Sequence, residues 1–393
     1  MKSRISLEIV IIFFITILVT SYVPTISESI SSGGADLGLA PAKCLFNGIN
    51  HYESFLSSDG RCEVERSHLG EYLQGYYVML YPLTFLDWDG ARIAWVFLNI
   101  SLIFLIPYFL CKKFEINKIS TFFIIFFCYY CIITRVNLIM GQITLVMLFF
   151  LTLPFIFKSK ISYVLSGITY FKYNIGYALF FLYLSSKKYK ILTLSLLPCF
   201  IGWVLYSLIT STNLVTNFFE PFLLMVNNMG ANSALKSIHI FSFINEFDII
   251  NSKYQTVITL IPSIIVNIFF ITRINKIQDN LLKLSCLNIS ILIFLPHYGH
   301  DYIILIPLLV YAIKNYDNNL FLSRINLITV IYFLQLYSGI QKFLNKIFIY
   351  LDLSFSLISF VNSAYPYFHI LILLLVLILN LQKSDQTIKH EAN

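Results

Sequence analysis

Long apolar stretches follow one another along nearly the whole chain, with few charged residues between them. Of the 393 residues, 58% are hydrophobic and only 12% are charged, whereas a soluble domain carries roughly 25% charged residues. A surface with so little charge is poorly suited to water and well suited to lipid. The sequence therefore predicts an all-α polytopic membrane protein.

Ten apolar stretches approach the length of a membrane-spanning helix, which is roughly 20 residues. They cover residues 7–24, 91–111, 119–134, 138–157, 190–211, 256–272, 282–296, 301–315, 325–340 and 366–382. We interpret the first as a retained signal anchor, because its apolar run is longer than a signal-peptide core and more spans follow it. No tandem repeat or low-complexity linker divides the chain, so we predict a single membrane domain over residues 1–393.

Basic residues gather in short clusters between these stretches, and the clusters predict an orientation. They are Lys2 and Arg4, Lys112 to Lys118, Lys158 to Lys160, Lys187 to Lys190, Arg273 to Lys283, Lys314 to Arg324, and Lys383 to Lys389. Lys and Arg accumulate in the cytoplasmic loops of membrane proteins. Ten spans then place both termini in the cytoplasm. The same rule accounts for the net charge of +7 without a nucleic-acid partner.

Residues 161–184 do not fit a single span, because basic clusters of the cytoplasmic type flank both ends. The centre of the segment carries Gly167, Lys172, Asn174 and Gly176. Irregular backbone at membrane depth is tolerated where it is buried in protein or lines a water-filled cavity. We therefore favour a re-entrant hairpin of two half-helices with Lys172 near its tip, with a single span as the alternative.

This topology leaves two large loops on the outer face, at about residues 25–90 and 212–255. The first holds nine acidic residues against three basic ones. The second contains apolar stretches too short to span the bilayer, which suit interfacial helices.

Cys44 and Cys62 share the first loop, and they would form a disulfide if it faces an oxidising compartment. Cys128 and Cys131 form a C-x-x-C pair without a second ligand pair, so we predict no metal site there.

Several polar residues that are distant in sequence fall on the outer side of this topology. They are Asp36 after the first span, Arg135 and Gln142 at the turn between the third and fourth spans, Lys172 in the hairpin, and His297, His300 and Asp301 between the seventh and eighth spans. Each has a simpler interpretation as a solvated loop residue, a helix-packing group or a snorkelling side chain. Together they describe a cavity with an acid and several cations, which a group transfer from a phosphate donor requires.

Eleven residues separate Asp36 from Gly48, and three residues separate Gly48 from Tyr52. This spacing resembles the first-loop pattern of the family-87 glycosyltransferases, polytopic enzymes of the C-type superfamily that use polyprenyl-phosphate sugars, typically mannose. Five further stretches are similar to that family in the same order: YPLTFLDWDGARIAWVFLN (81–99), GQITLVMLFFL (141–151), LSGITYFKYNIG (165–176), NSAL (232–235) and PHYGHDYIILIP (296–307). The usual tyrosine–proline–proline before the second span is absent.

The resemblance implies a C-type glycosyltransferase fold and an inverting transfer with Asp36 as general base. It implies that Arg135, Lys172 and His300 stabilise the departing lipid phosphate and that Gln142 orients the sugar or phosphate. Tyr52 and Asp301 complete the implied substrate-binding set. The implied donor is a polyprenyl-phosphate sugar, and the acceptor is a glycan or glycolipid. No cofactor is expected, and a metal requirement stays open because Asp36 is a solitary acid.

We further expect a monomer among the lipids of a bacterial plasma membrane, with the active site on the outer, periplasmic side. The abundance of Ile, Asn, Lys and Phe is typical of an AT-rich bacterial genome.

Three alternatives to a glycosyltransferase are a transporter or flippase of lipid-linked sugars, a polysaccharide polymerase, and a receptor or structural membrane protein. Transporters often contain inverted repeats, whereas this chain has none and gathers its polar residues toward one leaflet.

Overall fold

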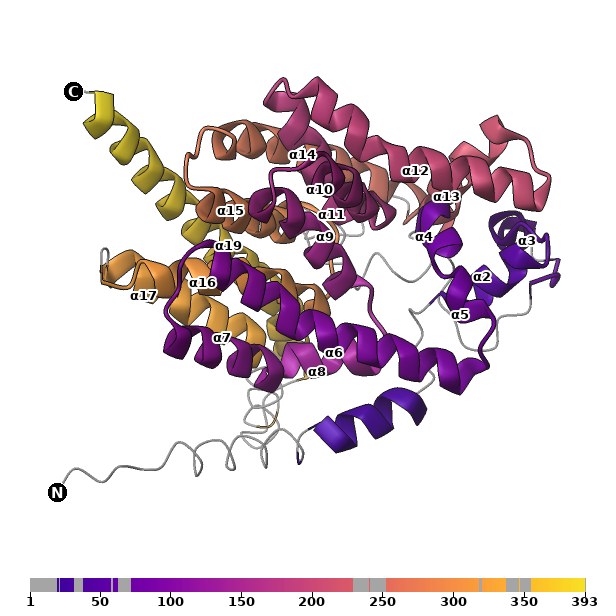
Figure 1. The fold of residues 1–393 in the computed structure, drawn as a ribbon, viewed down its shortest axis with the longest axis horizontal. Coiled ribbons are helices and arrows are strands. Elements are labelled where there is room, and N and C mark those ends of the chain that lie inside the picture. Colours follow the sequence, from indigo (N-terminus) through magenta and orange to yellow (C-terminus); the bar gives the residue numbers. More distant parts are fainter. Residues whose placement is uncertain are drawn as a thin grey trace.

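The computed structural model describes residues 20, 22–31, 38–57, 59–62, 72–228, 240, 252–317, 320–336, 346 and 355–392. These residues form helices and connecting turns and contain no β-strand (Figure 1). A first helix covers 22–31. The labelled helices are α2 (Leu39–Phe46), α3 (His51–Ser57), α4 (Gln74–Met79), α5 (Tyr81–Thr84), α6 (Trp88–Lys113), α7 (Lys118–Tyr130), α8 (Ile132–Met140), α9 (Thr144–Ile156), α10 (Lys160–Ser166), η1 (Gly167–Phe171), α11 (Tyr173–Ser185), α12 (Tyr189–Thr210), α13 (Leu214–Asn228), α14 (Ser252–Ile274), α15 (Asn280–Phe294), η4 (Gly299–Leu305), α16 (Ile306–Lys314), α17 (Leu320–Ile331), η5 (Tyr332–Leu336) and α19 (Phe355–Ala392).

Among the described residues, three helices are long and apolar enough to cross a membrane. They are α6, α12 and the Tyr365–Ser384 part of α19, and α7 with α8 would form a fourth span bent by 51°. These four coincide with the predicted spans at 91–111, 119–134, 190–211 and 366–382. The all-helical membrane-type fold of the prediction is therefore present, whereas the number of ten spans is not established by these helices.

Some predicted spans are occupied by shorter helices. The 13-residue α9 lies within the predicted span 138–157, and the 15-residue α15 overlaps most of the predicted span 282–296. Helices of this length extend only about 20 Å, whereas the hydrocarbon core of a bilayer is about 30 Å thick. The first predicted span, 7–24, lies almost entirely outside the described residues.

Helix α6 shows how the sequence sets the ends of a long apolar helix. Asp87 caps its first turn, where the carboxylate accepts a hydrogen bond of 2.8 Å from the Gly90 backbone N–H. Lys112 and Lys113 occupy the last turn, where cations are favoured by the negative end of the helix dipole. The helix therefore carries acidic residues at one end and basic residues at the other.

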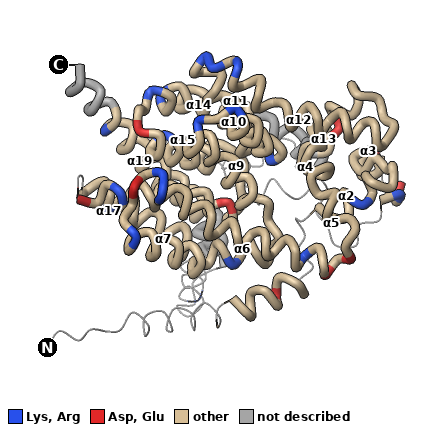
Figure 2. The backbone as a smooth tube through the Cα atoms, in the orientation of Figure 1, with Lys and Arg blue, Asp and Glu red and all other residues tan. Residues whose placement is uncertain are grey.

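Four of the basic clusters that were predicted to be cytoplasmic lie near one another. Ser186, at the end of α11, donates to the Asn275 side chain after α14 at 2.6 Å. Lys314 forms a 3.5 Å ion pair with Asp279 and lies over the Phe114 ring at 5.4 Å. These contacts join the regions of the 112–118, 187–190, 273–283 and 314–324 clusters. Figure 2 shows many Lys and Arg positions (blue) on the side that carries α15 and α17, while acidic positions mark the beginning of α6 at the other end.

The segment predicted as a hairpin is interrupted as expected from its glycines and lysine. Helix α10 ends at Ser166, η1 follows, and Lys172 separates η1 from α11. A Cβ at Gly176 would overlap the backbone of Tyr170, so the chain folds back on itself closely at this break. α10 packs on α9 and α12, and α11 packs on α14, α12 and α15.

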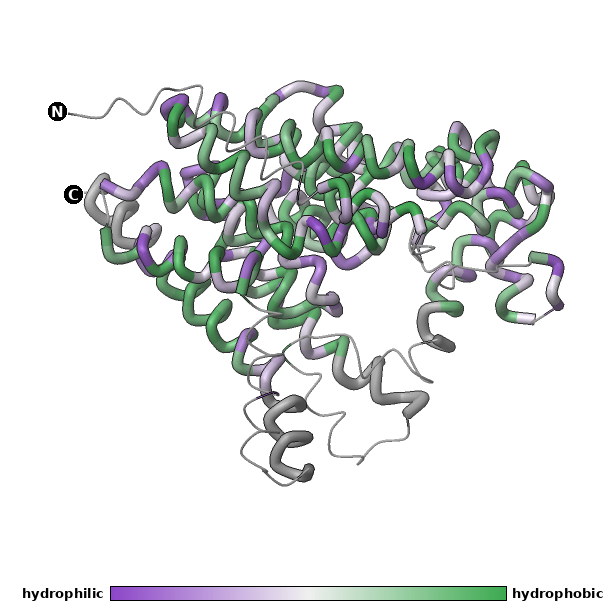
Figure 3. Tube along the Cα trace, turned by 90° about the horizontal axis from the view of Figure 1, so that it is seen from below, coloured by the Kyte–Doolittle hydropathy of each residue, from purple (hydrophilic) through white to green (hydrophobic). Residues whose placement is uncertain are grey.

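Helix α13 buries an asparagine against the protein and exposes several aromatic side chains. Asn217 is buried, and its side chain donates to Ser207 at 2.7 Å. Phe218, Phe219 and Phe222 are exposed. This arrangement agrees with the interfacial helix predicted for the 212–255 loop. Hydrophobic positions (green) also occur throughout the helical body in Figure 3, on its outer as well as its inner turns.

Candidate functional site

A buried cluster of three side chains forms the centre of the candidate site. Lys172 Nζ lies 2.6 Å from Asp301 Oδ1, in a direct ion pair. Thr144 Oγ1 donates to the same carboxylate oxygen at 2.6 Å and accepts a bond from Lys172 Nζ at 2.9 Å. Only 7% of Lys172 and 2% of Asp301 is exposed to solvent. We call Thr144, Lys172 and Asp301 the ionic triad.

The ends of three helical segments bring the triad together. Thr144 is the first residue of α9, Lys172 is the N-cap of α11, and Asp301 lies in the first turn of η4. The N-terminal end of a helix carries partial positive charge, which favours a nearby carboxylate. The contacts within the triad therefore depend on the relative positions of the ends of α9, α11 and η4.

The second oxygen of Asp301 is also occupied. Asp301 Oδ2 accepts a 3.2 Å hydrogen bond from the backbone N–H of Tyr298, and His300 Nε2 lies 3.8 Å from Asp301 Oδ1. An isolated charge in this environment would be costly. The ion pair and these hydrogen bonds thus hold Asp301 as a carboxylate and Lys172 as its counter-ion.

The turn before Asp301 contributes a neutral imidazole. His297 is buried, with Nδ1 3.2 Å from the Leu295 carbonyl oxygen, and Nε2 has no hydrogen-bond partner among the described residues. Burial lowers the pKa of His297 to about 4, against the opposing effect of Asp301. The ring is therefore neutral at pH 7. Asn174 and Asn137 fix this turn by donating to the Pro296 and His300 carbonyl oxygens at 2.8 and 2.7 Å.

Helix α6 supports the turn that precedes Thr144. Arg92 is fully buried, and its guanidinium donates to the Ser29 carbonyl oxygen at 2.7 Å and to the Ile139 carbonyl oxygen at 2.9 Å. The Trp95 indole donates to the Gly141 carbonyl oxygen at 3.0 Å. Arg92 thereby joins the 22–31 helix, α6 and α8.

Gly141→Ala should destabilise the protein strongly. Gly141 has a φ of +65°, and a Cβ there would overlap Arg92 Nη1. Left-handed backbone costs an L-residue about 1–2 kcal/mol, and displacing a buried guanidinium adds to that cost. Gly60→Ala is the matched control, because Gly60 has a φ of +70° with no atom within 4 Å of a Cβ. Thermal unfolding in detergent should show a clearly larger loss for Gly141→Ala, and equal losses would contradict the packing argument.

The predicted site residues are distributed unevenly around the triad. Lys172, His300 and Asp301 come together. Gln142 is buried two residues before Thr144, and its backbone N–H donates to the Asn137 carbonyl oxygen at 3.0 Å. Arg135 lies on α8, and no contact among the described residues joins its side chain to the triad. Asp36 and the 232–235 stretch lie outside the described residues.

Tyr52 is buried in an aromatic cluster and does not border the triad directly. Its hydroxyl donates to the Tyr72 carbonyl oxygen at 2.5 Å, and its ring packs against Tyr77 and Tyr206. Burial raises the pKa of the Tyr52 hydroxyl well above its ordinary value. Leu73, which follows Tyr72, donates its backbone N–H to the Phe171 carbonyl oxygen at 3.1 Å. The aromatic cluster is thus connected to the residue before Lys172.

The two predicted outer loops meet beside this aromatic cluster. Asn50 donates to the Glu220 carboxylate of α13 at 2.8 Å. Burial raises the pKa of Glu220, while the bond from Asn50 opposes this shift. The structure joins Cys44 to Cys62 in a disulfide, which closes the segment that contains α3. Sequence reasoning left that pairing open.

The described residues contain no group of three or more His, Cys, Asp or Glu side chains arranged to hold a metal ion. The ionic triad uses its single carboxylate to bind an ammonium group. The triad itself supplies ion pairing and hydrogen bonding.

No protein-family model, curated protein or solved structure matches this chain. The likeness to family-87 glycosyltransferases accordingly rests on the sequence stretches alone.

Proposed function

We propose that this chain is an integral membrane glycosyltransferase. It transfers a sugar, mannose or a similar hexose or pentose, from a polyprenyl-phosphate donor to a glycan or glycolipid acceptor. The proposal includes a C-type fold with about ten spans, cytoplasmic termini and an active site on the outer face of a bacterial plasma membrane. It also includes a re-entrant hairpin at 161–184.

One observation carries the proposal: four of the family-like stretches meet at the turn between α8 and α9. Trp95 of the 81–99 stretch bonds Gly141, and Thr144 bonds both Lys172 of the 165–176 stretch and Asp301 of the 296–307 stretch. Short motifs that match a family only by chance are not expected to lie in one network of contacts. Their convergence supports a common site.

In the proposed reaction, Asp36 takes the proton of an acceptor hydroxyl as that oxygen attacks the anomeric carbon of the donor. The new glycosidic C–O bond forms while the bond from that carbon to the phosphate oxygen breaks, and the phosphate leaves with the electron pair. The attack comes from the opposite face, so the anomeric configuration inverts. Asp36 lies two residues before Gly38 in the sequence, and Gly38 packs against the rings of Tyr76 and Tyr77.

The ionic triad suggests how Lys172 would assist the leaving group. An ammonium group has three N–H donors, and Thr144 and Asp301 accept two of them. The third donor is the one proposed to bind a phosphate oxygen, while Asp301 keeps the side chain in place. His300 and Arg135 are the other proposed phosphate contacts, and Gln142 orients the sugar or phosphate.

The sidedness of the molecule also supports the proposal. Tyr177 donates to the Ile264 carbonyl oxygen at 3.2 Å, and Ser186 bonds Asn275, so α11 and α14 run in the same direction. Lys172 precedes α11, whereas the basic clusters at 187–190 and 273–283 follow the ends of α11 and α14. The triad and these clusters are therefore about 20 Å apart along the 13-residue α11, on opposite proposed faces.

A transporter of lipid-linked sugars is the second candidate, because a charged residue at a helix break also occurs in transporter binding sites. Membranes containing the protein should be supplied with labelled polyprenyl-phosphate sugars and candidate acceptors. We expect a labelled glycan with a new glycosidic bond and loss of the donor. Labelled lipid that crosses the membrane without bond formation would favour the transporter. A thiol label at position 36 that reacts only from the cytoplasm would contradict the topology.

A further inference from the structure

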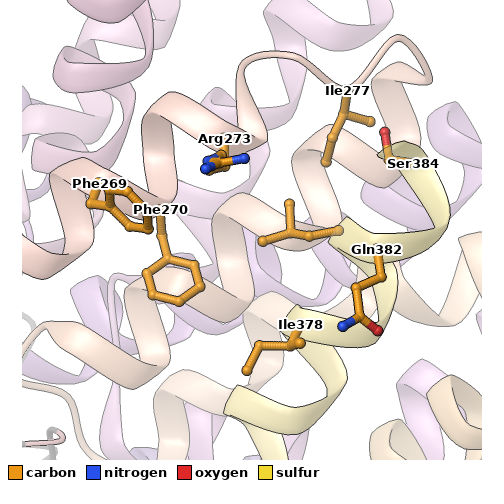
Figure 4. Close-up of a pocket in the computed structure, with 8 residues that line it drawn as sticks. Phe269, Phe270, Arg273, Ile277, Ile378, Gln382 and Ser384 are labelled. Carbon is orange, nitrogen blue, oxygen red and sulfur yellow. The ribbon is translucent and has the colours of Figure 1, made fainter. Parts of the chain in front are cut away.

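An open pocket of about 190 Å³ lies between the C-terminal part of α14 and α19. Its walls combine apolar side chains with three polar ones, Arg273, Gln382 and Ser384 (Figure 4). The pocket lies at the end of α14 that carries the basic cluster, away from the ionic triad. No role in the proposed transfer reaction draws on it.

Both helices that form the pocket carry an apolar stripe leading to it. Ile261, Ile265 and Phe269 of α14 are spaced four residues apart and are each 52–61% exposed. Residues four apart lie on the same face of a helix, and Arg273 continues this series. On α19, Leu371 and Leu375 are about 60% exposed and precede Ile378 at the pocket. Two exposed apolar stripes thus end at the same polar group of residues.

The cation at the end of these stripes is available to a ligand. Arg273 is exposed, and its guanidinium lies 5.6 Å from the centre of the Phe269 ring. None of the carboxylates in the described part of the chain forms an ion pair with it. The nearby acid Asp279 is paired with Lys314 at 3.5 Å. Lys276 adds a second exposed positive charge one turn further on.

We propose that this pocket binds an anionic phospholipid. Its phosphate group lies on Arg273, its headgroup hydroxyls lie near Gln382 and Ser384, and its two acyl chains follow the stripes of α14 and α19. A guanidinium binds a phosphate through paired N–H donors, and two stripes fit a lipid with two chains. This proposal needs the protein to be embedded in a membrane, but it does not need the transferase activity.

Native mass spectrometry of the full chain in detergent tests the proposal. Phosphatidylglycerol should bind more tightly than phosphatidylcholine, and Arg273→Gln should weaken phosphatidylglycerol binding roughly tenfold, since one charge-assisted contact is lost. Arg324→Gln is the matched control, because Arg324 is an exposed arginine on α17 outside the pocket. It should leave the affinity unchanged.

Three results would overturn the proposal. Equal affinity for both phospholipids would mean that the headgroup charge is not recognised. Unchanged phosphatidylglycerol binding by Arg273→Gln would remove the arginine from the site. Tighter binding of single-chain undecaprenyl phosphate than of phosphatidylglycerol would identify a different lipid class. Glycosyl transfer is measured separately, so either proposal can fail alone.

Discussion

Asp36→Asn should reduce glycosyl transfer by roughly 10²–10⁴-fold, which is the usual contribution of a general base. The substitution keeps nearly the same size but replaces one carboxylate oxygen by an NH2 donor, so it removes the negative charge that would accept the acceptor's proton. The initial rate of labelled glycan formation in membranes measures the effect. The amount of full-length protein in the same membranes should stay unchanged, because the substitution removes only one charge from a short side chain.

Asp89→Asn is the matched control for Asp36→Asn. Asp89 belongs to the same predicted outer loop, lies in the first turn of α6 and is exposed. Its replacement should leave the transfer rate within about twofold, since surface substitutions away from special features have small effects. A stable Asp36→Asn protein with an unaltered transfer rate would exclude Asp36 from the mechanism. An equal loss in both variants would indicate a general effect of loop charge.

Hydropathy predicted the class of the fold better than the number of spans. Residues 281–295 of the region around α15 are buried apart from Lys283, which is partly exposed. A helix in the centre of a bundle and a helix facing lipid have equally apolar sequences. Apolar length therefore does not distinguish a central helix from a span. The basic clusters carry a second signal, and contacts in the fold bring four of them near one another.

Two members of the ionic triad were candidates from the sequence, whereas the third member and the contacts were not predicted. The sequence placed Lys172 and Asp301 on the same side, but it could not indicate that they form an ion pair. Pairing depends on the relative register of α11 and η4, which no local pattern encodes. Thr144 was missed because a threonine at the start of an apolar helix has no distinguishing signal. The contacts of Arg92 were not predictable, because its partners are mainly backbone carbonyl groups, which every sequence contains.

Breaking the ionic triad should have the largest effect on stability. Lys172→Met or Asp301→Leu alone leaves an uncompensated buried charge, and such changes typically cost about 3–5 kcal/mol. The double variant Lys172→Met/Asp301→Leu removes both charges, so most of this loss should be recovered. Thermal unfolding of the purified protein in detergent measures the three variants against the wild type. Lys190→Met, an exposed lysine on α12, is the control and should have little effect.

The double variant also separates a structural role of the triad from a role in the reaction. If Lys172 offers its third N–H donor to the departing phosphate, the double variant should fold and yet transfer sugar far more slowly than the wild type. A folded double variant with full activity would limit the triad to stability. Single variants as stable as the wild type would mean that the charges are not buried together as the distances between Thr144, Lys172 and Asp301 require. Because stability and transfer are measured on the same preparations, a loss of rate in a well-folded double variant cannot be attributed to misfolding.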